Sequence, residues 1–413
     1  MIFLQNFFYI NLYSSLFLIL SSILPTGFKS TFFYLSLISA IIIIFYFFLQ
    51  NKSYRLFGMN YEKIGLILFF WIALSSLFSS TTLSDALNAT FEYRVFLICP
   101  LFACIVSATE FKPKAFSHTM VVGASTALFA SFLGAIGLVD FAGESRSLGN
   151  SIFHGFSMSV LVSVALFFSR KSSGLAGLGW LILAALVVFS VFGIEVGRTA
   201  YLQIIGCLAL FIITDPKSLK TWRIVFFLLG CLVFSFVISS DFEAVLNRTL
   251  SGTMDIKPPS ESADRSSALR LDWWFYSLTL IKDNWVTGIG LSEIPMYLNL
   301  GHKSDLIKVP TDNLHSEFLT MFLGTGIFGF LLLFLYFAVM FFEGFRLYVR
   351  NQSLSSYFLM VLPTIFIIGC VFNSSLKDFG EKHLMICILS VATGLLGRRP
   401  ELDFSRPSAR ERD

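Results

Sequence analysis

Charged side chains are scarce in this chain: Asp, Glu, Lys and Arg together make up 14% of its 413 residues. A typical soluble globular domain carries roughly a quarter of its residues as charged ones. Hydrophobic residues make up 55% instead, and Phe alone occurs 49 times. The net charge of +4 is small, and no basic face with interleaved aromatics is evident, which argues against a nucleic-acid partner. The shortage of charge predicts that lipid is the solvent for most of the chain.

The chain also lacks the short motifs of soluble nucleotide-binding and hydrolytic enzymes. It has no GxGxxG after a strand, no P-loop, no HExxH and no Gly-x-Ser-x-Gly elbow. The six cysteines all lie in apolar runs without metal-ligand spacing, so we expect small buried hydrophobic side chains rather than ligands or disulfides. We therefore expect no metal and no other cofactor.

Long apolar runs are abundant. A helix crosses a bilayer with roughly 20 mostly apolar residues, and by that measure the chain has about twelve transmembrane helices. The predicted fold class is an all-α polytopic membrane protein. The first run is expected to be retained, because Met1–Phe8 has no Lys or Arg and no small-residue cleavage site follows. The candidate spans lie near residues 7–25, 31–49, 63–80, 93–109, 119–138, 152–169, 174–193, 197–214, 222–239, 316–342, 356–374 and 382–397.

Lys and Arg are distributed unevenly among the segments between these spans. Segments that follow even-numbered spans hold 17 of them, segments that follow odd-numbered spans hold 6, and the long loop at 240–315 holds 7. Since cytoplasmic segments carry the excess of Lys and Arg, both termini are predicted to be cytoplasmic. The predicted organisation is helices 1–9 in 1–239, an outer loop with interfacial helices at 240–315, helices 10–12 in 316–397 and a cytoplasmic tail at 398–413.

Charges on the predicted outer side are few, and ionisable groups close to a membrane span are usually kept for a partner or a task. Arg198 opens the eighth span after a very short link. It either pairs with Glu195 to cap a tight hairpin or binds an anion at the helix N-terminus, where the dipole favours negative charge. Arg146 and Asn150 precede the sixth span and His154 follows them, where an ordinary polar loop is the simpler interpretation.

The outer loop is expected to contain a helix at Ser266–Asn284. Three of the six Trp residues of the chain lie in or next to it, so we expect this helix to lie on the outer membrane interface. Arg265 and Arg270 stand at its start. Either arginine can simply extend its head group to water, but Arg270, amid aromatics near a helix N-terminus, is also well placed to bind phosphate.

His315 lies where the outer loop ends and the tenth span begins. Asp312 is the expected N-cap, which places His315 in the first helical turn. A histidine there is often structural, yet the helix N-terminus would disfavour the imidazolium and keep a neutral ring available as a base. The link at 373–383 is also rich in charge. Its Asp378 and Glu381 either pair with the arginines or contact an acceptor sugar.

Taken in order, these features resemble the O-antigen ligase and polymerase superfamily. The resemblance spans about residues 60–395, and the long outer loop lies in the expected place. Ser316 is a departure, since the family often has Asn after the His. The stretches that carry the likeness are Arg146 with Gly149-Asn150, Gly197-Arg198-Thr199, Arg270 ahead of the Trp-rich helix, Leu314-His315-Ser316-Glu317 and Gly324-Thr325-Gly326-Ile327-Phe328-Gly329.

The resemblance implies a membrane-embedded glycosyltransferase of the C type, acting at the periplasmic face of a bacterial inner membrane without metal or nucleotide. The implied donor is a glycan on undecaprenyl pyrophosphate. In the ligases the acceptor is a sugar hydroxyl of the lipid A–core, in lipopolysaccharide biosynthesis, and the anomeric centre is inverted. The implied catalytic base is His315, the implied pyrophosphate-binding residues are Arg198 and Arg270, and the secondary site residues are Arg146, Arg265, Glu317 and Asp378.

Three other functions remain open from the sequence. A polymerase of the same superfamily would join repeat units on the same lipid carrier. A protein O-oligosaccharyltransferase usually has a larger soluble C-terminal part. A lipid-linked sugar flippase or secondary transporter needs polar groups within several spans, and these spans are mostly plain.

Overall fold

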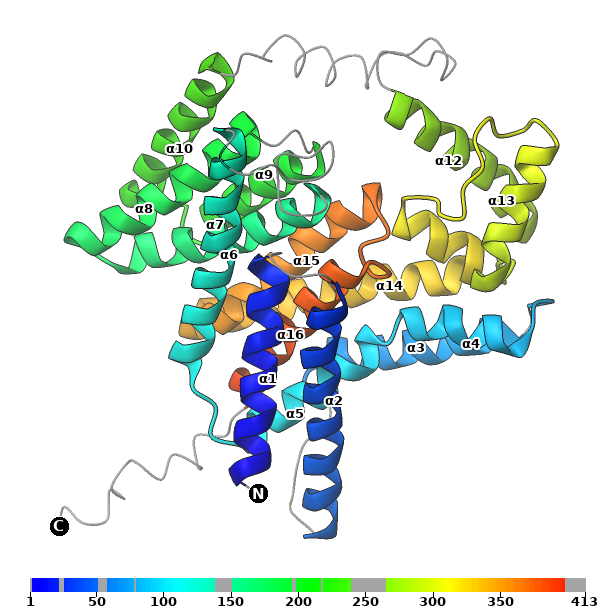
Figure 1. Cartoon of the computed structure of the whole chain (residues 1–413), viewed down its shortest axis with the longest axis horizontal. Helices are drawn as coiled ribbons and strands as arrows, with labels where there is room; N and C mark the ends of the chain where they lie inside the picture. The colour runs from blue at the N-terminus through cyan, green and yellow to red at the C-terminus, as the bar shows by residue number, and fades with distance from the viewer. Residues whose placement is uncertain are drawn as a thin grey trace.

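The computed structural model describes residues 2–21, 26–50, 58–77, 79–136, 138, 151–194, 198–216, 218–238 and 265–397 (Figure 1). Within these ranges every regular element is a helix, which confirms the predicted all-α membrane fold. The helices are α1 (Ile2–Ser21), α2 (Thr26–Leu49), α3 (Asn60–Leu77), α4 (Leu83–Glu92), α5 (Val95–Ala108), α6 (Pro113–Ala135), α7 (Ser151–Lys171), α8 (Gly174–Phe189), η1 (Ser190–Ile194), α9 (Arg198–Ile213), α10 (Leu219–Ile238), α12 (Arg265–Asn284), η2 (Leu291–Glu293), α13 (Ile294–Lys303), α14 (Glu317–Asn351), α15 (Leu354–Phe372) and α16 (Phe379–Leu396).

Each of the twelve predicted spans coincides with a helix or a bent pair of helices in the described part of the chain. Eight of these helices are long and apolar enough to cross a membrane, and nine spans result if the pair α4 and α5, bent by 50°, counts as one. The helices α3, α9 and α10 occupy the other three predicted spans without meeting the same criteria; α9 is too short. The polytopic class is therefore confirmed, while the number of twelve stays a prediction.

Burial separates central helices from peripheral ones. The apolar windows of α7 and α16 are 89% and 78% buried, whereas those of α2 and α8 are each 33% buried. Exposed apolar side chains such as Ile41 and Phe45 on α2 are what a lipid-facing helix carries. Polar contacts at the helix ends are described below. The helices that form them are therefore interior helices of the bundle or helices next to these.

Close contacts between helix ends divide the bundle into two ends. At one end, the first turn of α7 meets the first turn of α9, where Gly155 packs on Ala200. The end of α15 and the start of α16 lie there too, since Gly369 packs on the Phe156 ring. We call this the His315 end. At the opposite end, which we call the Gln352 end, the ammonium of Lys171 donates to Gln352 Oε1 at 2.8 Å.

The helix ends that share the His315 end are those that the count of Lys and Arg predicts on one side of the membrane. This grouping agrees with helices that alternate in direction across a bilayer. Which end faces the cytoplasm is not decided by the packing, so the predicted cytoplasmic termini stay a prediction.

The 35-residue helix α14 is broken at Gly326, whose φ of +69° and ψ of −170° are not helical. The segment that follows α12 forms backbone hydrogen bonds with α14 on both sides of this break. The N–H of Ile289 donates to the Leu323 carbonyl at 2.8 Å, and the Ile327 N–H donates to the Trp285 carbonyl at the same distance. The backbone groups that the break leaves without helical partners are thereby satisfied. The Gly-rich stretch of α14 thus fastens the segment after α12 to the membrane helices.

Candidate functional site

The helix α12 lies beside the start of α14, at the right-hand side of Figure 1, in the segment where an outer helix is expected. Its two indoles hold the segment that leads into α14. Trp273 Nε1 donates to the Val309 carbonyl at 3.0 Å, and Trp274 Nε1 donates to the Leu314 carbonyl at 2.8 Å. An indole N–H usually finds an acceptor when it is buried. The aromatic residues of α12 therefore position the chain on both sides of residue 312.

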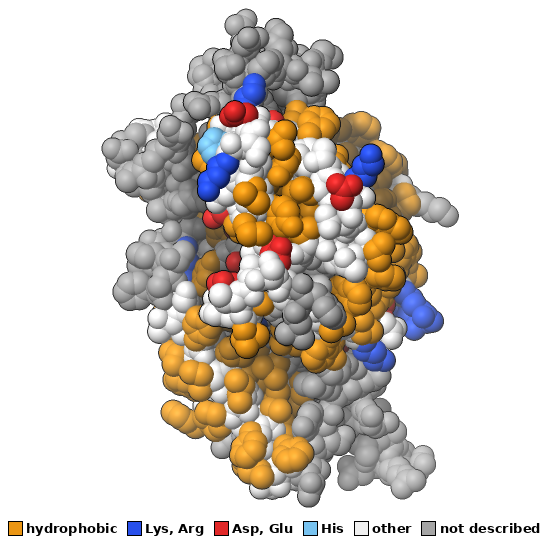
Figure 2. All heavy atoms as spheres, turned by 90° about the vertical axis from the view of Figure 1, so that its right-hand side faces the viewer, with side chains coloured by type: hydrophobic (Ala, Val, Ile, Leu, Met, Phe, Trp, Pro, Cys, Tyr) orange, Lys and Arg blue, Asp and Glu red, His pale blue; other side chains and the backbone are white. Residues whose placement is uncertain are grey.

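Exposed apolar side chains occur among charged ones on this face of the molecule (Figure 2). On α12 and α13 they include Phe275, Leu278, Met296 and Leu300, which are 44–59% exposed. Such a surface suits a membrane interface, where aromatic and apolar groups meet polar head groups. The placement of these helices on the interface stays a prediction.

His315 precedes α14 instead of lying within it. The predicted cap, Asp312, is wrong: the N-cap is Ser316, whose side chain accepts the Leu319 N–H at 3.5 Å. His315 itself adopts a left-handed conformation with φ of +49°. The chain reaches this conformation through a turn in which Asn313 Oδ1 accepts the His315 N–H at 3.0 Å. Local side-chain bonds of this kind override a cap further upstream.

The imidazole of His315 is half-buried against an aromatic wall. Its ring stacks on Trp273 with centroids 5.5 Å apart and planes inclined by 30°. Burial lowers the pKa of His315 below its usual value, the charge of Arg270 lowers it further, and Asp312 partly opposes both. The predicted direction is confirmed, but burial and a neighbouring cation cause it, with no contribution needed from the helix N-terminus. A lowered pKa favours the neutral form of the ring, which has a nitrogen that can accept a proton.

Arg270 and His315 share this site although 45 positions separate them in sequence. Arg270 lies in the second turn of α12, is half-buried and donates from Nη1 to the Phe372 carbonyl at 3.2 Å. That carbonyl belongs to the last residue of α15. The helix α12, the end of α15 and the segment that leads into α14 therefore meet near one guanidinium and one imidazole.

Glu317, the first residue of α14, is completely buried. Its Oε1 accepts the hydroxyl of Tyr93 at 2.5 Å, and its Oε2 accepts the Leu376 N–H at 3.1 Å. Its own N–H donates to the Asn373 carbonyl at 3.1 Å. With both carboxylate oxygens bound to protein groups, Glu317 is suited to hold three segments together beside His315.

The link between α15 and α16 adds charge to the site. Lys377 forms a salt bridge with Glu92 at 3.0 Å, and Lys382 Nζ donates to the carbonyls of Glu92 and Lys377 at 3.1 and 2.9 Å. Asp378 is next to these lysines. Burial raises its pKa, although the charges of Lys382 and Lys377 act in the opposite direction. The described contacts of the charged residues in this link are therefore made within the link and with Glu92, the last residue of α4.

Three residues of this region were not singled out from the sequence: Lys377, Lys382 and Asn313. Lys377 and Lys382 are the only Lys or Arg residues of the link at 373–383, and the density of charge in this link was the available signal. For Asn313 no signal was available, because nothing in the sequence shows that its side-chain oxygen accepts the His315 N–H.

Three predicted site residues are placed only in part or not at all. Arg146 lies outside the described residues. Arg198 is the first residue of α9 and Arg265 the first of α12, but their side chains are outside the described part. Because Ala200 packs on Gly155, the start of α9 belongs to the His315 end. The backbone of Arg198 is thus at the same end of the bundle as His315 and Arg270.

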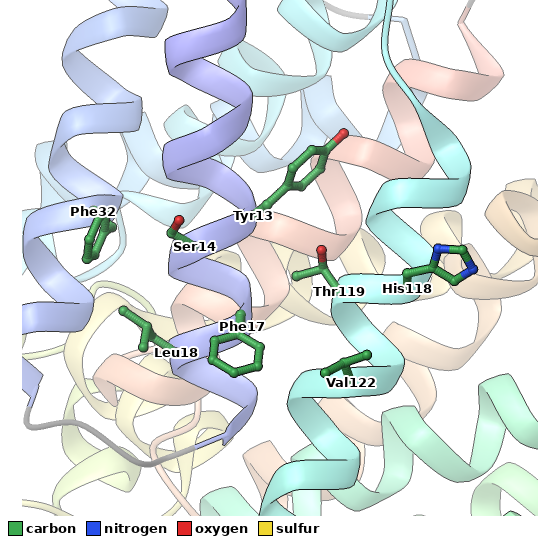
Figure 3. Close-up of a pocket in the computed structure, with 8 residues that line it drawn as sticks. All are labelled: Tyr13, Ser14, Phe17, Leu18, Phe32, His118, Thr119 and Val122. Carbon is green, nitrogen blue, oxygen red and sulfur yellow. The ribbon is translucent and has the colours of Figure 1, made fainter.

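The cavities found among the described residues lie elsewhere. One of 610 Å³ lies between α1, α2 and α6 and is lined by Tyr13, Phe17, Phe32 and Val122, among others (Figure 3). A larger one of 910 Å³ lies near the Gln352 end. Neither is lined by a residue of the His315 cluster. Within the described ranges no group of three His, Cys, Asp or Glu side chains could hold a metal ion.

The fold and this cluster define a polytopic α-helical membrane protein in which α12 and the segment before α14 bring an arginine and a histidine to one end of the bundle. Residues 183–334 match the family model described as O-antigen ligase. The match runs from α8 into α14, contains Arg198, Arg270 and His315, and supports the O-antigen ligase family that the motifs resemble. No curated protein matches the chain.

Proposed function

We propose that this protein transfers a glycan from undecaprenyl pyrophosphate to a sugar hydroxyl of the lipid A–core. The observation that carries the proposal is the placement of a half-buried His315, whose pKa is lowered, near Arg270 just before α14. The O-antigen ligase match over the same residues supports the reaction class, a glycosyltransferase acting on lipid-linked glycan. The proposed location is the periplasmic face of a bacterial inner membrane.

In the proposed reaction His315 is the general base. A sugar hydroxyl has a high pKa and reacts well only when a base in hydrogen-bond reach takes its proton. The hydroxyl oxygen forms a bond to the anomeric carbon, the proton passes to the imidazole, and the bond from that carbon to the pyrophosphate oxygen breaks. Direct displacement of this kind inverts the anomeric centre.

The departing undecaprenyl pyrophosphate carries the electron pair of the broken bond. Guanidinium groups remain charged and bind phosphate oxygens with two parallel hydrogen bonds. Arg270, beside His315, and Arg198, at the same end of the bundle, are proposed to bind it. Their fixed charges would stabilise the leaving group in place of a metal ion. The reaction is thus proposed to be metal-independent.

The test uses purified full-length protein in liposomes with lipid-linked glycan and lipid A–core. We expect His315→Ala to abolish transfer while donor binding persists, because the arginines hold the pyrophosphate. A base typically contributes on the order of a hundred- to ten-thousand-fold in rate. His315→Gln keeps a donor and an acceptor, so transfer at the wild-type rate by this variant would make His315 part of the scaffold only.

A deletion strain distinguishes the ligase from the related polymerase. For a ligase, the lipid A–core loses all long chains while carrier-linked polymer is still made. A core that bears a single repeat unit would instead identify the polymerase.

A further inference from the structure

A cavity of 910 Å³ opens among α6, α7, α8, α15 and α16 near the Gln352 end. Its residues fall into two groups. The apolar group includes Phe116, Val121, Phe167, Phe168, Trp180, Phe358, Val391 and Leu395. The polar group comprises Lys114, Ser117, His118, Asn351, Ser353 and Ser355.

The two groups occupy different depths in the bundle. Most of the polar residues stand at helix ends: Lys114 is the second residue of α6, Asn351 the last of α14, and Ser353 the N-cap of α15. Much of the apolar group lies a turn or more further in. Trp180 is one of these, and its ring stacks on Phe168 of α7 with centroids 5.0 Å apart. The cavity therefore changes from polar to apolar along the helix direction, as a phospholipid does from head group to acyl chain.

Lys114 is the charged residue of the polar rim. Lys114 and His118 line it one helical turn apart, and the lining contains no Asp or Glu. Lys171 is close to the same rim, because its ammonium donates to Gln352, the residue between Asn351 and Ser353. A rim with lysines and no acid complements an anionic head group.

A second hollow borders the other side of α6. Figure 3 shows Thr119 directed towards α1 and His118 directed away from it. Both cavities include His118 and Val122 in their lining. The first three turns of α6 are thus flanked by apolar space on both sides, which gives room for two acyl chains.

We propose that the cavity at the Gln352 end is a binding site for an anionic phospholipid of the adjoining leaflet. The phosphate lies at Lys114 and Lys171, and an acyl chain covers the Phe168–Trp180 stack. The site is at the opposite end of the bundle from His315, so it is independent of the transfer reaction.

Trp180 provides the measurement. Full-length protein is reconstituted in liposomes that contain a small, equal mole fraction of either phosphatidylglycerol or phosphatidylcholine with brominated acyl chains. The fluorescence of Trp180 is obtained as the difference between wild type and Trp180→Phe. We expect the anionic lipid to quench Trp180 with roughly fivefold higher apparent affinity than the zwitterionic one, the preference expected from a basic residue near anionic lipid.

The charge variants test the assignment of the rim. Lys114→Gln combined with Lys171→Gln should remove the preference without changing the quenching by phosphatidylcholine. Lys63→Gln is the matched control, since Lys63 is exposed in the first turn of α3 and does not line the cavity. Equal quenching by both lipids in the wild type would mean ordinary annular contact and would overturn the proposal, as would a preference that survives the double variant.

Discussion

The side-chain oxygen of Asn313 accepts two hydrogen bonds, one from the backbone N–H of His315 at 3.0 Å and one from the hydroxyl of Ser374 at 2.6 Å. The first bond closes the turn that places His315 at positive φ, a conformation that few non-glycine residues adopt. The second fastens that turn to the link after α15. One acceptor therefore connects the conformation of the proposed base to the segment that Arg270 also contacts, through the carbonyl of Phe372.

Asn313→Ala should lower the transfer rate roughly tenfold to a hundredfold, because a misplaced base loses alignment with its hydroxyl. The Michaelis constant for the donor should change little, since the arginines remain. Asn313→Asp keeps the acceptor and should recover most of the rate. Asn284→Ala, in the last turn of α12, is the control, because among the described residues its side chain bonds only within its own helix, donating to the Leu280 carbonyl at 3.0 Å.

The outcomes for Asn313 separate two failures. If His315→Ala is inactive while Asn313→Ala transfers at the wild-type rate, Asn313 does not position the base. If His315→Ala is active, the proposed function itself is wrong.

The pH dependence of His315 follows from its surroundings. Burial and Arg270 lower its pKa below the ordinary value of 6.5. A base must be neutral, so transfer should be constant around neutral pH and should fall only when the pH drops through this lowered pKa. Arg270→Gln removes one of the two causes, so the pKa should rise, while burial still keeps it below 6.5.

The rate of modification of His315 by diethyl pyrocarbonate, measured against pH, reports this pKa without requiring activity. Subtracting the signal of His315→Gln removes the contribution of the other four histidines. An unchanged titration midpoint in Arg270→Gln would show that the two side chains do not interact.

Arg270→Lys keeps the positive charge and loses the planar fork. If the fork binds pyrophosphate, the variant should lose transfer by roughly a hundredfold while it still accumulates in the membrane. Arg198→Lys should behave similarly. Arg346→Lys, near the far end of α14, is the matched control. Normal transfer by Arg270→Lys and Arg198→Lys would mean that charge alone matters, and normal transfer by both Ala variants would remove them from the site.

Gly326→Ala should prevent accumulation of folded protein. Its φ of +69° is strained for any residue with a Cβ, and a Cβ there would collide with the carbonyl of Val286. Gly179→Ala in α8 is the comparison, because nothing lies within 4 Å of its added Cβ and its backbone is helical. Equal membrane levels and equal melting temperatures of the two variants would refute the proposed role of the break.

Reporter fusions test the orientation. A fusion at Lys171 should report the cytoplasm and a fusion at Asp305 the periplasm, because the count of Lys and Arg is 17 against 6. A cytoplasmic signal at Asp305 would also contradict the proposed function, since the lipid-linked glycan is on the other side.

Local patterns were sufficient for the class of fold and for the helix α12. In lipid a long apolar run forms a helix regardless of its neighbours, because the helix satisfies the backbone polar groups within the segment. The all-α polytopic fold predicted from these runs is confirmed. The helix expected at Ser266–Asn284 is present as α12, because its side-chain pattern favours it locally. The lowered pKa of His315 was anticipated in direction, though for a different cause.

The start of α14 shows where local patterns fail. Asp312 and Ser316 are both good caps, and only the turn held by Asn313 decides between them. That turn depends on Ser374, which is 61 residues away. Glu317 likewise meets the hydroxyl of Tyr93 across 224 residues. The packing of the helices determines contacts between residues so far apart in sequence. No spacing along the chain predicts them. The sequence by itself therefore determined a lipid-embedded helical chain with a histidine at the start of a helix. The tertiary structure alone decided that the Trp273 ring and the Asn313 amide lie against that histidine.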